Sequence, residues 1–203
     1  MKETPIIFST AMVRAILDGK KTQTRRVVRL KRHPTDHEWH APFYAKNKWC
    51  FSAGFGLAHK SQTIECPHGK PGDRLWVRET WAYGNNVRPR VKDEVIYKAD
   101  DRWCVLKWKP SIHMFKKYAR IWLEIVNVRV EKLRDIGIED VHAEGIERWR
   151  DYEGGTHLSA VTTRNDFQRL WDSINGKKHP WSENPWVWMI EFKRISLNGD
   201  ITA

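Results

Sequence analysis

The chain has 203 residues, of which 40% are hydrophobic and 12 are Trp, enough apolar material to fill the core of one domain. Its 36 Lys and Arg against 25 Asp and Glu give a formal net charge of +11, which favours a polyanionic partner such as RNA or DNA over a merely solubilising surface. No apolar run approaches the roughly 20 residues that span a bilayer, and the N-terminus lacks a signal-peptide layout, so we expect no membrane partner and a cytoplasmic location.

The three cysteines, Cys50, Cys66 and Cys104, are an odd number without a C-x-x-C pair. A disulfide framework is therefore not expected. His68 follows Cys66 closely and could join Cys50 in binding zinc, but the paired spacing of zinc sites is missing. We predict buried thiols, with no metal and no cofactor.

The N-terminal segment predicts a short strand from Ile6, then a helix, then a cationic loop. Ser9 or Thr10 can cap the helix, and Gly19 can end it in the left-handed conformation. Residues 20–26 follow, with four cationic side chains and two hydroxyls. We interpret this segment as a functional loop held at the helix exit.

Residues 27–70 lose regular periodicity and mix His, Pro, Gly and aromatic residues. This pattern indicates a long insertion or loop, and such loops in compact domains are usually functional or mobile. Its aromatic side chains either stack on nucleobases or hold the loop on the core.

Residues 75–81 alternate with period 2 after a Pro-Gly turn and predict a strand. Glu79 falls in register with apolar residues, which fits an ion pair at the strand end better than direct catalysis. Trp76 and Trp81 are candidate stacking platforms, with ordinary core packing as the alternative.

Two more strands are predicted, at 95–99 and at 120–133. The second changes phase around Asn127, which is typical of a bulge that bends a strand around a small barrel. A helix at 138–146 follows and ends near Gly145. Glu144 in its last turn is unfavourable at the negative end of the helix dipole, so this acid is either functional or paired with Arg148 or Arg150.

The remaining chain predicts a loop at 151–161, a helix at 163–174, a cationic turn at 176–185 and a closing strand at 186–192. Residues 196–203 should fray. This order of elements predicts a single α+β domain over 1–203 with a curved, mostly antiparallel sheet, carrying an insertion at 27–70.

Four motifs together resemble the ASCH domain, a branch of the PUA-like superfamily. They are Gly19-Lys20-Lys21-Thr22-x-Thr24-x-Arg26, Pro71-Gly72-Asp73-x-Leu75-x-Val77, Leu133 followed by Ala143-Glu144-Gly145, and Trp188-x-Ile190-x-Phe192. The extended form with Lys70 to Trp81 is similar to longer versions found in bacteriophages and prophages. The match leaves residues 27–70 and about 147–162 uncovered.

The resemblance implies a small curved or closed β-barrel with flanking helices that commonly handles RNA. A small bacterial branch of the family deacylates N4-acylated cytidines with a Lys, a Thr and a Glu. By motif position these would be Lys21, Thr24 and Glu144, with Glu79 as the reserve acid.

The chemistry of Lys21 is compatible with two functions. Crowding by neighbouring cations disfavours its ammonium form, so a neutral amine could take a proton from Thr24 or water while Glu144 protonates the departing amine. If Lys21 instead stays protonated, it would hold a phosphate or an oxyanion together with Arg26.

We therefore predict an RNA-binding or modified-nucleotide-binding protein, with an N4-acylcytidine amidohydrolase as the alternative. A ribonuclease is a further alternative and would need a base such as His142. The charge favours a polymeric partner, because a nucleoside carries no phosphate. The predicted binding residues are Lys20, Lys21, Thr22, Arg25, Arg26, Trp76, Arg78, Glu79 and Trp81. The oligomeric state is left open.

Overall fold

The computed structural model describes residues 1–30, 39–40, 42–45, 48–53, 60–84, 87–88, 94–100, 104–105, 107–146 and 160–195. These segments form a mixed α+β structure that is rich in strands and has few helices, as the order of sequence patterns indicated. None of the helices in this part of the chain is both long enough and apolar enough to cross a membrane.

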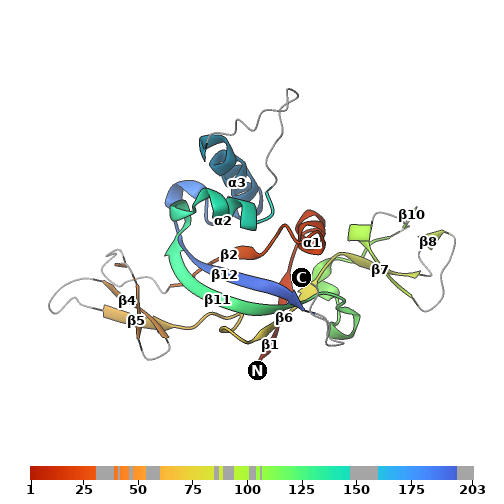
Figure 1. Cartoon of the computed structure of the whole chain (residues 1–203), viewed down its shortest axis with the longest axis horizontal. Coiled ribbons are helices and arrows are strands. Elements are labelled where there is room, and N and C mark those ends of the chain that lie inside the picture. The colour runs from red at the N-terminus through yellow and green to blue at the C-terminus, as the bar shows by residue number, and fades with distance from the viewer. Residues whose placement is uncertain are drawn as a thin grey trace.

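A five-stranded sheet forms the centre of the molecule (Figure 1). Its strand order is β1-β6-β11-β12-β2, with β1 and β6 parallel and every other neighbouring pair antiparallel. The sheet is strongly curved and open, so β1 and β2 are its edges. Its strands are β1 (Glu3–Ile7), β2 (Gln23–Val27), β6 (Arg74–Arg78), β11 (Trp122–Lys132) and β12 (Trp186–Ile195).

A bulge bends β11 where the sequence predicted a change of phase. Ile125 pairs with Phe192 and Asn127 pairs with Glu191, so Val126 is left without a partner in the register. Val126 is accordingly exposed, whereas Ile125 is fully buried. The extra residue increases the local twist, and this fits the pronounced curvature of β11 in Figure 1.

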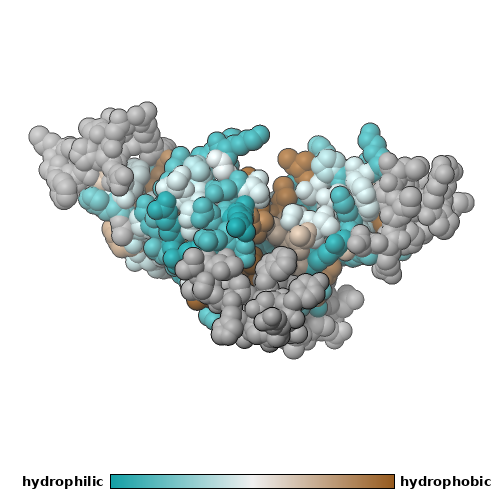
Figure 2. Space-filling model, turned by 90° about the horizontal axis from the view of Figure 1, so that it is seen from above, coloured by the Kyte–Doolittle hydropathy of each residue, from teal (hydrophilic) through white to brown (hydrophobic). Residues whose placement is uncertain are grey.

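The helices α1 (Thr10–Leu17), α2 (Ile138–Ala143) and α3 (Ala160–Asn175) lie on the inner side of the curved sheet (Figure 1). The helices α2 and α3 lie over one end of the β11–β12 pair, and α1 lies over the other end. The surface over α2 and α3 is mainly hydrophilic, and a narrow hydrophobic band borders it (Figure 2). Short 3-10 turns are η3 (Lys98–Asp100), η4 (Ser111–His113), η5 (Lys116–Tyr118), η6 (Leu133–Asp135) and η7 (Trp181–Glu183).

The helix α1 confirms the predicted cap and stop. The Ser9 hydroxyl accepts a hydrogen bond from the backbone N–H of Met12 at 3.3 Å. Gly19 follows the helix with a φ of +72°, the left-handed conformation that glycine adopts at little cost. Val13 and Ile16 bury the inner face of α1.

Two apolar clusters hold these layers together. The larger joins α1 to the sheet and includes Ile6, Leu75 and Ile190. The smaller joins α2, α3 and the loop before β12, with Trp171 and Val187 at its centre. The position of β2 between these clusters therefore decides where the cationic side chains of residues 20–26 lie.

The interpretation of residues 20–26 as a loop is wrong for most of its length. Residues Gln23–Val27 form β2, which pairs with β12 from Val187 to Glu191. The strand places successive side chains on opposite faces, so Arg25 and Arg26 enter different surroundings.

Much of the expected insertion at 27–70 is also regular structure. The strands β3 (Phe43–Ala45), β4 (Lys48–Ala53) and β5 (Lys60–Ile64) form an antiparallel sheet in the order β3-β4-β5. Phe51 of β4 is fully buried in the main core, and its ring lies 5.6 Å from that of Trp186 in an edge-on arrangement. Some of the aromatic residues in this segment therefore do attach it to the core.

The predicted strand at 75–81 is divided in two. β6 ends at Arg78, and the chain resumes as β7 (Trp81–Tyr83), which pairs with β9 (Val95–Tyr97). A further pair is formed by β8 (Val87–Arg88) and β10 (Cys104–Val105). The predicted loop at 151–161 falls almost wholly outside the described residues, and the predicted fraying at 196–203 falls outside them entirely.

Candidate functional site

Lys21 and Glu144 form a buried ion pair, although 123 positions separate them. The Nζ of Lys21 lies 2.6 Å from Oε2 of Glu144 and also donates to the Glu144 carbonyl oxygen at 2.8 Å. The side chain of Lys21 has no exposed surface, and that of Glu144 is 4% exposed. The two residues also face each other as an isolated antiparallel bridge between the α1–β2 connection and the end of α2.

Gly145 lets these two segments approach. Its φ is +86°, and a Cβ atom at this position would lie 2.9 Å from the Cβ of Ala15 and 3.0 Å from the Cβ of Lys21. A side chain here would press directly on the buried pair. The requirement for glycine explains why α2 ends at this position, with Glu144 as its C-cap.

Arg25 extends the ion pair into a network with three carboxylates. Its Nη1 lies 3.2 Å from Oε1 of Glu144, its Nη2 lies 2.9 Å from Oδ2 of Asp140, and its Nε donates to Oε1 of Glu131 at 2.8 Å. Arg129 contacts the last two acids, at 3.1 Å and 2.8 Å. Three cations thus face three carboxylates, so the network is balanced in charge and does not by itself attract an anion.

The pKa of Lys21 is lowered, chiefly because the ammonium is buried. The Glu144 carboxylate opposes this effect, and the positive charges of Arg26 and Arg25 add only smaller contributions. The direction agrees with the sequence-based expectation, but the expected cause was crowding by neighbouring cations, and burial is the larger one.

Arg26 lies on the opposite face of β2 from Arg25. Its Nη2 donates to the carbonyl oxygen of Ile7 at 2.8 Å, which links the two edge strands of the sheet. Its guanidinium carbon lies 5.3 Å from the centre of the Phe8 ring, and Nζ of Lys21 lies 5.7 Å from the same ring. Burial lowers the pKa of Arg26, and the Glu144 carboxylate opposes that shift.

The other predicted residues of this segment differ in exposure. Thr24 is buried in β2 opposite Ile190. Thr22 is exposed and contributes through its backbone N–H, which donates to the Ala143 carbonyl at 2.8 Å. Lys20 is exposed, with its Nζ 3.7 Å from Oδ2 of Asp18.

Glu79 belongs to a second cluster, and no contact in the described part of the chain joins it to Lys21. Its carboxylate accepts two hydrogen bonds from Arg120, at 2.9 and 3.0 Å, and Arg120 also donates to Asp100 at 2.7 Å. The Arg120 guanidinium lies over the ring of Tyr97, 4.0 Å from its centre. Burial raises the pKa of Glu79, and Arg120 opposes the shift. Glu79 thus makes the ion pair that its position at a strand end favoured.

The predicted stacking residues Trp76 and Trp81 are both buried. Trp81 is 1% exposed and its ring lies 5.2 Å from that of Tyr118, while the Arg78 guanidinium carbon lies 5.1 Å from the ring of Trp76. Arg78 also donates to the Met114 carbonyl oxygen at 3.1 Å. In this structure the two tryptophans pack within the protein and present little ring surface to a base.

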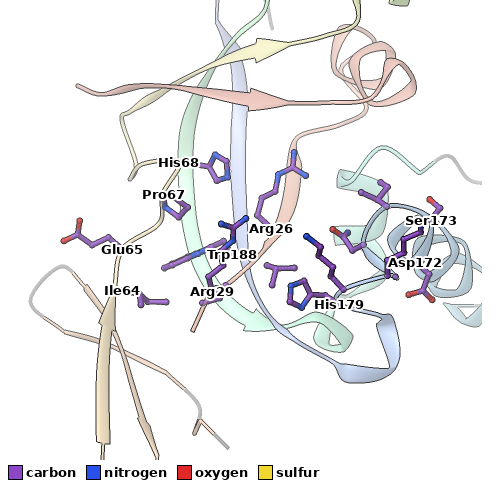
Figure 3. A pocket seen from close by; sticks show the side chains of 17 residues that line it. Arg26, Arg29, Ile64, Glu65, Pro67, His68, Asp172, Ser173, His179 and Trp188 are labelled. Carbon is purple, nitrogen blue, oxygen red and sulfur yellow. The ribbon is translucent and has the colours of Figure 1, made fainter. Parts of the chain in front are cut away.

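A groove of about 1080 Å³ lies beside Arg26 and is shown in Figure 3. Three segments far apart in the sequence form it: residues 26–29, residues 64–68, and residues 172–179 at the end of α3. Trp188 forms part of its wall and points from β12 toward the segment that carries Ile64 and Pro67 (Figure 3). Lys21, Thr24 and Glu144 do not line this groove.

The groove is positively charged. Arg26, Arg29, Lys177 and Lys178 line it, against the acids Glu65 and Asp172. Both acids already have partners, because Glu65 pairs with Lys48 at 3.0 Å and Asp172 accepts from the backbone N–H of Trp181 at 2.7 Å.

Three of the groove cations remain free to meet a ligand. Arg29, Lys177 and Lys178 are exposed and have no ion-pair partner among the described residues. An anionic ligand would therefore meet an excess of positive charge that internal carboxylates do not neutralise.

His68 lies on the wall opposite α3 (Figure 3). Its Nδ1 is buried and has no hydrogen-bond partner within the described segments. Burial and the nearby Arg26 and Lys2 lower the pKa of His68 to about 4, so the ring is neutral at pH 7. It offers the groove one polar ring that carries no charge.

Sequence reasoning found the Lys21 segment but missed the groove and three members of the ion network, Arg129, Glu131 and Asp140. The charges of the 176–185 turn and the Cys66-Pro67-His68 segment were visible in the sequence, but nothing in their spacing indicated that they share one surface.

A scan against protein-family models found no match, and searches of curated proteins and of solved structures found no similar protein.

Proposed function

We propose that the protein binds single-stranded nucleic acid, with RNA preferred, in the groove between β2, the residue 64–68 segment and the end of α3. The observation that carries this proposal is the set of cations Arg29, Lys177 and Lys178 around one groove, which are exposed and have no ion-pair partner in the part of the chain that the structure describes. Phosphate groups are the natural partners of such a set, and each phosphate neutralised adds affinity. The formal net charge of +11 would attract the same ligand from a distance.

Single strands suit this groove better than a duplex. His68 and His179 place ring systems among the cations, and unstacked bases pack on such rings. Because His68 is neutral at pH 7, its ring can pack on a base without adding to the charge of the groove.

The preference for RNA rests on the resemblance to the ASCH domain, which we retain as a proposal together with a PUA-like barrel. The link from Arg26 to the carbonyl oxygen of Ile7 supports the barrel interpretation, because a side chain there spans the gap between the two open edges. Four motifs spread from Gly19 to Phe192 support the family assignment.

The test compares salt dependence of binding between two variants with equal charge. Arg29→Ala/Lys177→Ala/Lys178→Ala removes three groove cations, and Lys98→Ala/Lys107→Ala/Lys193→Ala removes three exposed lysines elsewhere. Binding of labelled single-stranded RNA is followed by fluorescence anisotropy over a salt series, with DNA of the same sequence as a second ligand.

We expect the groove variant to lower the slope of log K against log salt by about 2, because each lost phosphate contact removes about 0.7 on a single strand. The control variant should keep most of the slope. Equal losses in the two variants would reduce the interaction to general attraction by net charge and would overturn the proposed groove.

The second candidate is the N4-acylcytidine amidohydrolase. The buried pair of Lys21 and Glu144, together with the lowered pKa of Lys21, favours it, because a lysine that loses its proton readily can act as a base. Access argues against it: Lys21 has no exposed surface and Thr24 is 1% exposed, so a substrate would have to open the pair.

An assay of N4-acetylcytidine deacylation tests this candidate. Turnover by the wild type would establish the enzyme, and its loss in Lys21→Met, in a preparation shown to be folded, with turnover kept in the groove variant, would assign the reaction to the buried pair. A folded wild type without turnover would leave binding as the function.

The ribonuclease has less support, because Nδ1 of His142 lies 3.1 Å from the carbonyl oxygen of Ile146, a helix-end contact rather than a catalytic one. Intact RNA after the binding assay would exclude it.

A further inference from the structure

A second cavity of about 540 Å³ adjoins the groove and shares Ile64, Glu65 and Trp188 with it. The separate three-stranded sheet supplies one wall, through Tyr44 of β3 and Trp49 of β4. The Pro-Gly turn before β6 and the β1 end of the sheet supply another. Its size is within the usual range of sites for small organic ligands.

The aromatic side chains of this cavity offer a stacking surface. Tyr44 and Trp49 are cross-strand partners, with ring centres 5.2 Å apart and planes inclined at 52°. Tyr44 is 59% exposed although it is a large aromatic residue. Trp188 of β12 lies at the shared border but is buried in the core, so Tyr44 and Trp49 supply the ring surface that a ligand can reach.

The charges around the cavity favour an anionic ligand with an aromatic group. Asp73 is satisfied by the backbone N–H groups of Lys2 and Lys70, at 2.7 and 3.1 Å. The ammonium groups of Lys2 and Lys70 have no carboxylate partner in the described part of the chain, and Nζ of Lys2 meets only the Pro67 carbonyl oxygen at 3.4 Å. Two cations beside aromatic rings match a nucleotide, which has both a phosphate and a flat base.

We propose that this cavity receives a nucleobase of the same single strand whose phosphates lie in the groove, so that the binding site continues across Trp188 onto the three-stranded sheet. This inference rests on the proposed function. It gives the 27–70 segment a role in recognition, because Tyr44 and Trp49 both belong to it.

The experiment separates base stacking from phosphate contact. The variants are Tyr44→Leu and Trp49→Leu, and the matched control is Phe43→Leu, because Phe43 is the neighbour of Tyr44 in β3, is 57% exposed and does not line the cavity. Two probes of equal length and charge are used, an oligouridine of about eight nucleotides and its abasic counterpart, a length suited to the site sizes of single-strand binders.

For the wild type we expect the base-containing probe to bind more tightly than the abasic probe, which lacks every base. Tyr44→Leu and Trp49→Leu should lower the ratio of the two affinities by about fivefold or more, the contribution of one stacked base, while Phe43→Leu keeps the wild-type ratio. Because Tyr44 is exposed, its variant should stay folded even if Trp49→Leu does not.

An unchanged ratio in Tyr44→Leu, or an equal loss in Phe43→Leu, would overturn the inference. If the aromatic variants have no effect while the groove variant still loses salt dependence, the inference fails and the proposed function stands. If the wild type binds neither probe, the proposed function fails.

Discussion

Nζ of Lys21 and Oε2 of Glu144 lie 2.6 Å apart in a region closed to solvent, and this contact fastens the end of α2 to the start of β2. Removing one member of a buried pair leaves an uncompensated charge, which costs about 3–5 kcal/mol. We expect Lys21→Met to lower the free energy of unfolding by that amount, as measured by urea denaturation. Glu144→Gln should be costly too, because it leaves Lys21 and Arg25 facing a neutral amide.

The double variant Lys21→Met/Glu144→Gln should lose less than the sum of the two single variants, which is the signature of a direct interaction. Lys20→Met is the surface control and should change stability by no more than about 0.5 kcal/mol. A cost below about 1 kcal/mol for Lys21→Met would contradict a structural role for the pair.

Gly145→Ala should destabilise the protein by about 2–4 kcal/mol, from the left-handed backbone and from overpacking against Lys21 and Ala15. Gly19→Ala is a matched comparison, because its φ is +72° but nothing lies within 4 Å of the added Cβ. That variant should cost only the backbone part, about 1–2 kcal/mol. Equal costs at both positions, measured by thermal or urea unfolding, would mean that the close approach at Gly145 is not tight.

The low pKa of His68 predicts a specific loss of stability in acid. The unfolded chain takes up the proton near the ordinary value of 6.5, whereas the folded protein takes it up near 4. The unfolded state therefore binds more protons between these values, and stability falls as the pH falls from about 6.5 to about 4.

His68→Asn should remove this component. The measurement is the urea midpoint of wild type and variant at a series of pH values, where the difference between the two proteins isolates residue 68. If the urea midpoints of the two proteins differ by the same amount at every pH in this range, the pKa of His68 is the same in the folded and unfolded states.

Arg120→Met should destabilise the protein by about 3 kcal/mol, since it leaves the buried Glu79 carboxylate without its partner. The loss should depend on pH with a defined sign. Burial already raises the pKa of Glu79 above 4.5, and loss of Arg120 raises it further, so the folded variant takes up a proton before the unfolded chain does. The deficit relative to wild type should shrink as the pH falls toward 4.5. A deficit that is constant with pH would contradict this account. In a Glu79→Gln background, Arg120→Met should cost the same free energy of unfolding across this pH range, because the titrating carboxyl is absent from both proteins.

Local signals made several elements predictable. The helix α1 could be predicted because its cap at Ser9 and its stop at Gly19 lie next to it in the sequence. The bulge in β11 was visible as a change in alternation around Asn127. The α+β order and the antiparallel character of most of the sheet followed from the same periodicities.

The strand β2 could not be predicted in the same way. A segment with adjacent Arg25 and Arg26 does not resemble a strand, since charged side chains are rarely buried without partners. The acids that satisfy Arg25 are Glu131, Asp140 and Glu144, which lie 106, 115 and 119 residues away. Nothing near Arg25 in the sequence indicates those distant partners.

The candidate site was predictable only in part for a related reason. A family resemblance predicts Lys21 and Glu144 as members of one site, and the structure places them in direct contact. The groove is assembled from residues 26–29, 64–68 and 172–179, whose proximity depends on the curvature of the sheet. Periodicity describes one element at a time and does not indicate which elements will share a surface.

Because Val126 has no partner in the register with β12, the strand β11 can lose one residue at this position without changing which side chains face the core. Leu123 and Ile125 face the core before it, and Val130 faces the core after it, so the inside positions change from odd to even numbers. Deleting Val126 would leave both halves with their apolar residues inward and would mainly flatten the strand. A deletion elsewhere in β11 would turn the residues between it and the bulge to the wrong face, because side chains alternate with period 2. Among single-residue changes of length in this strand, the fold is therefore most tolerant at Val126.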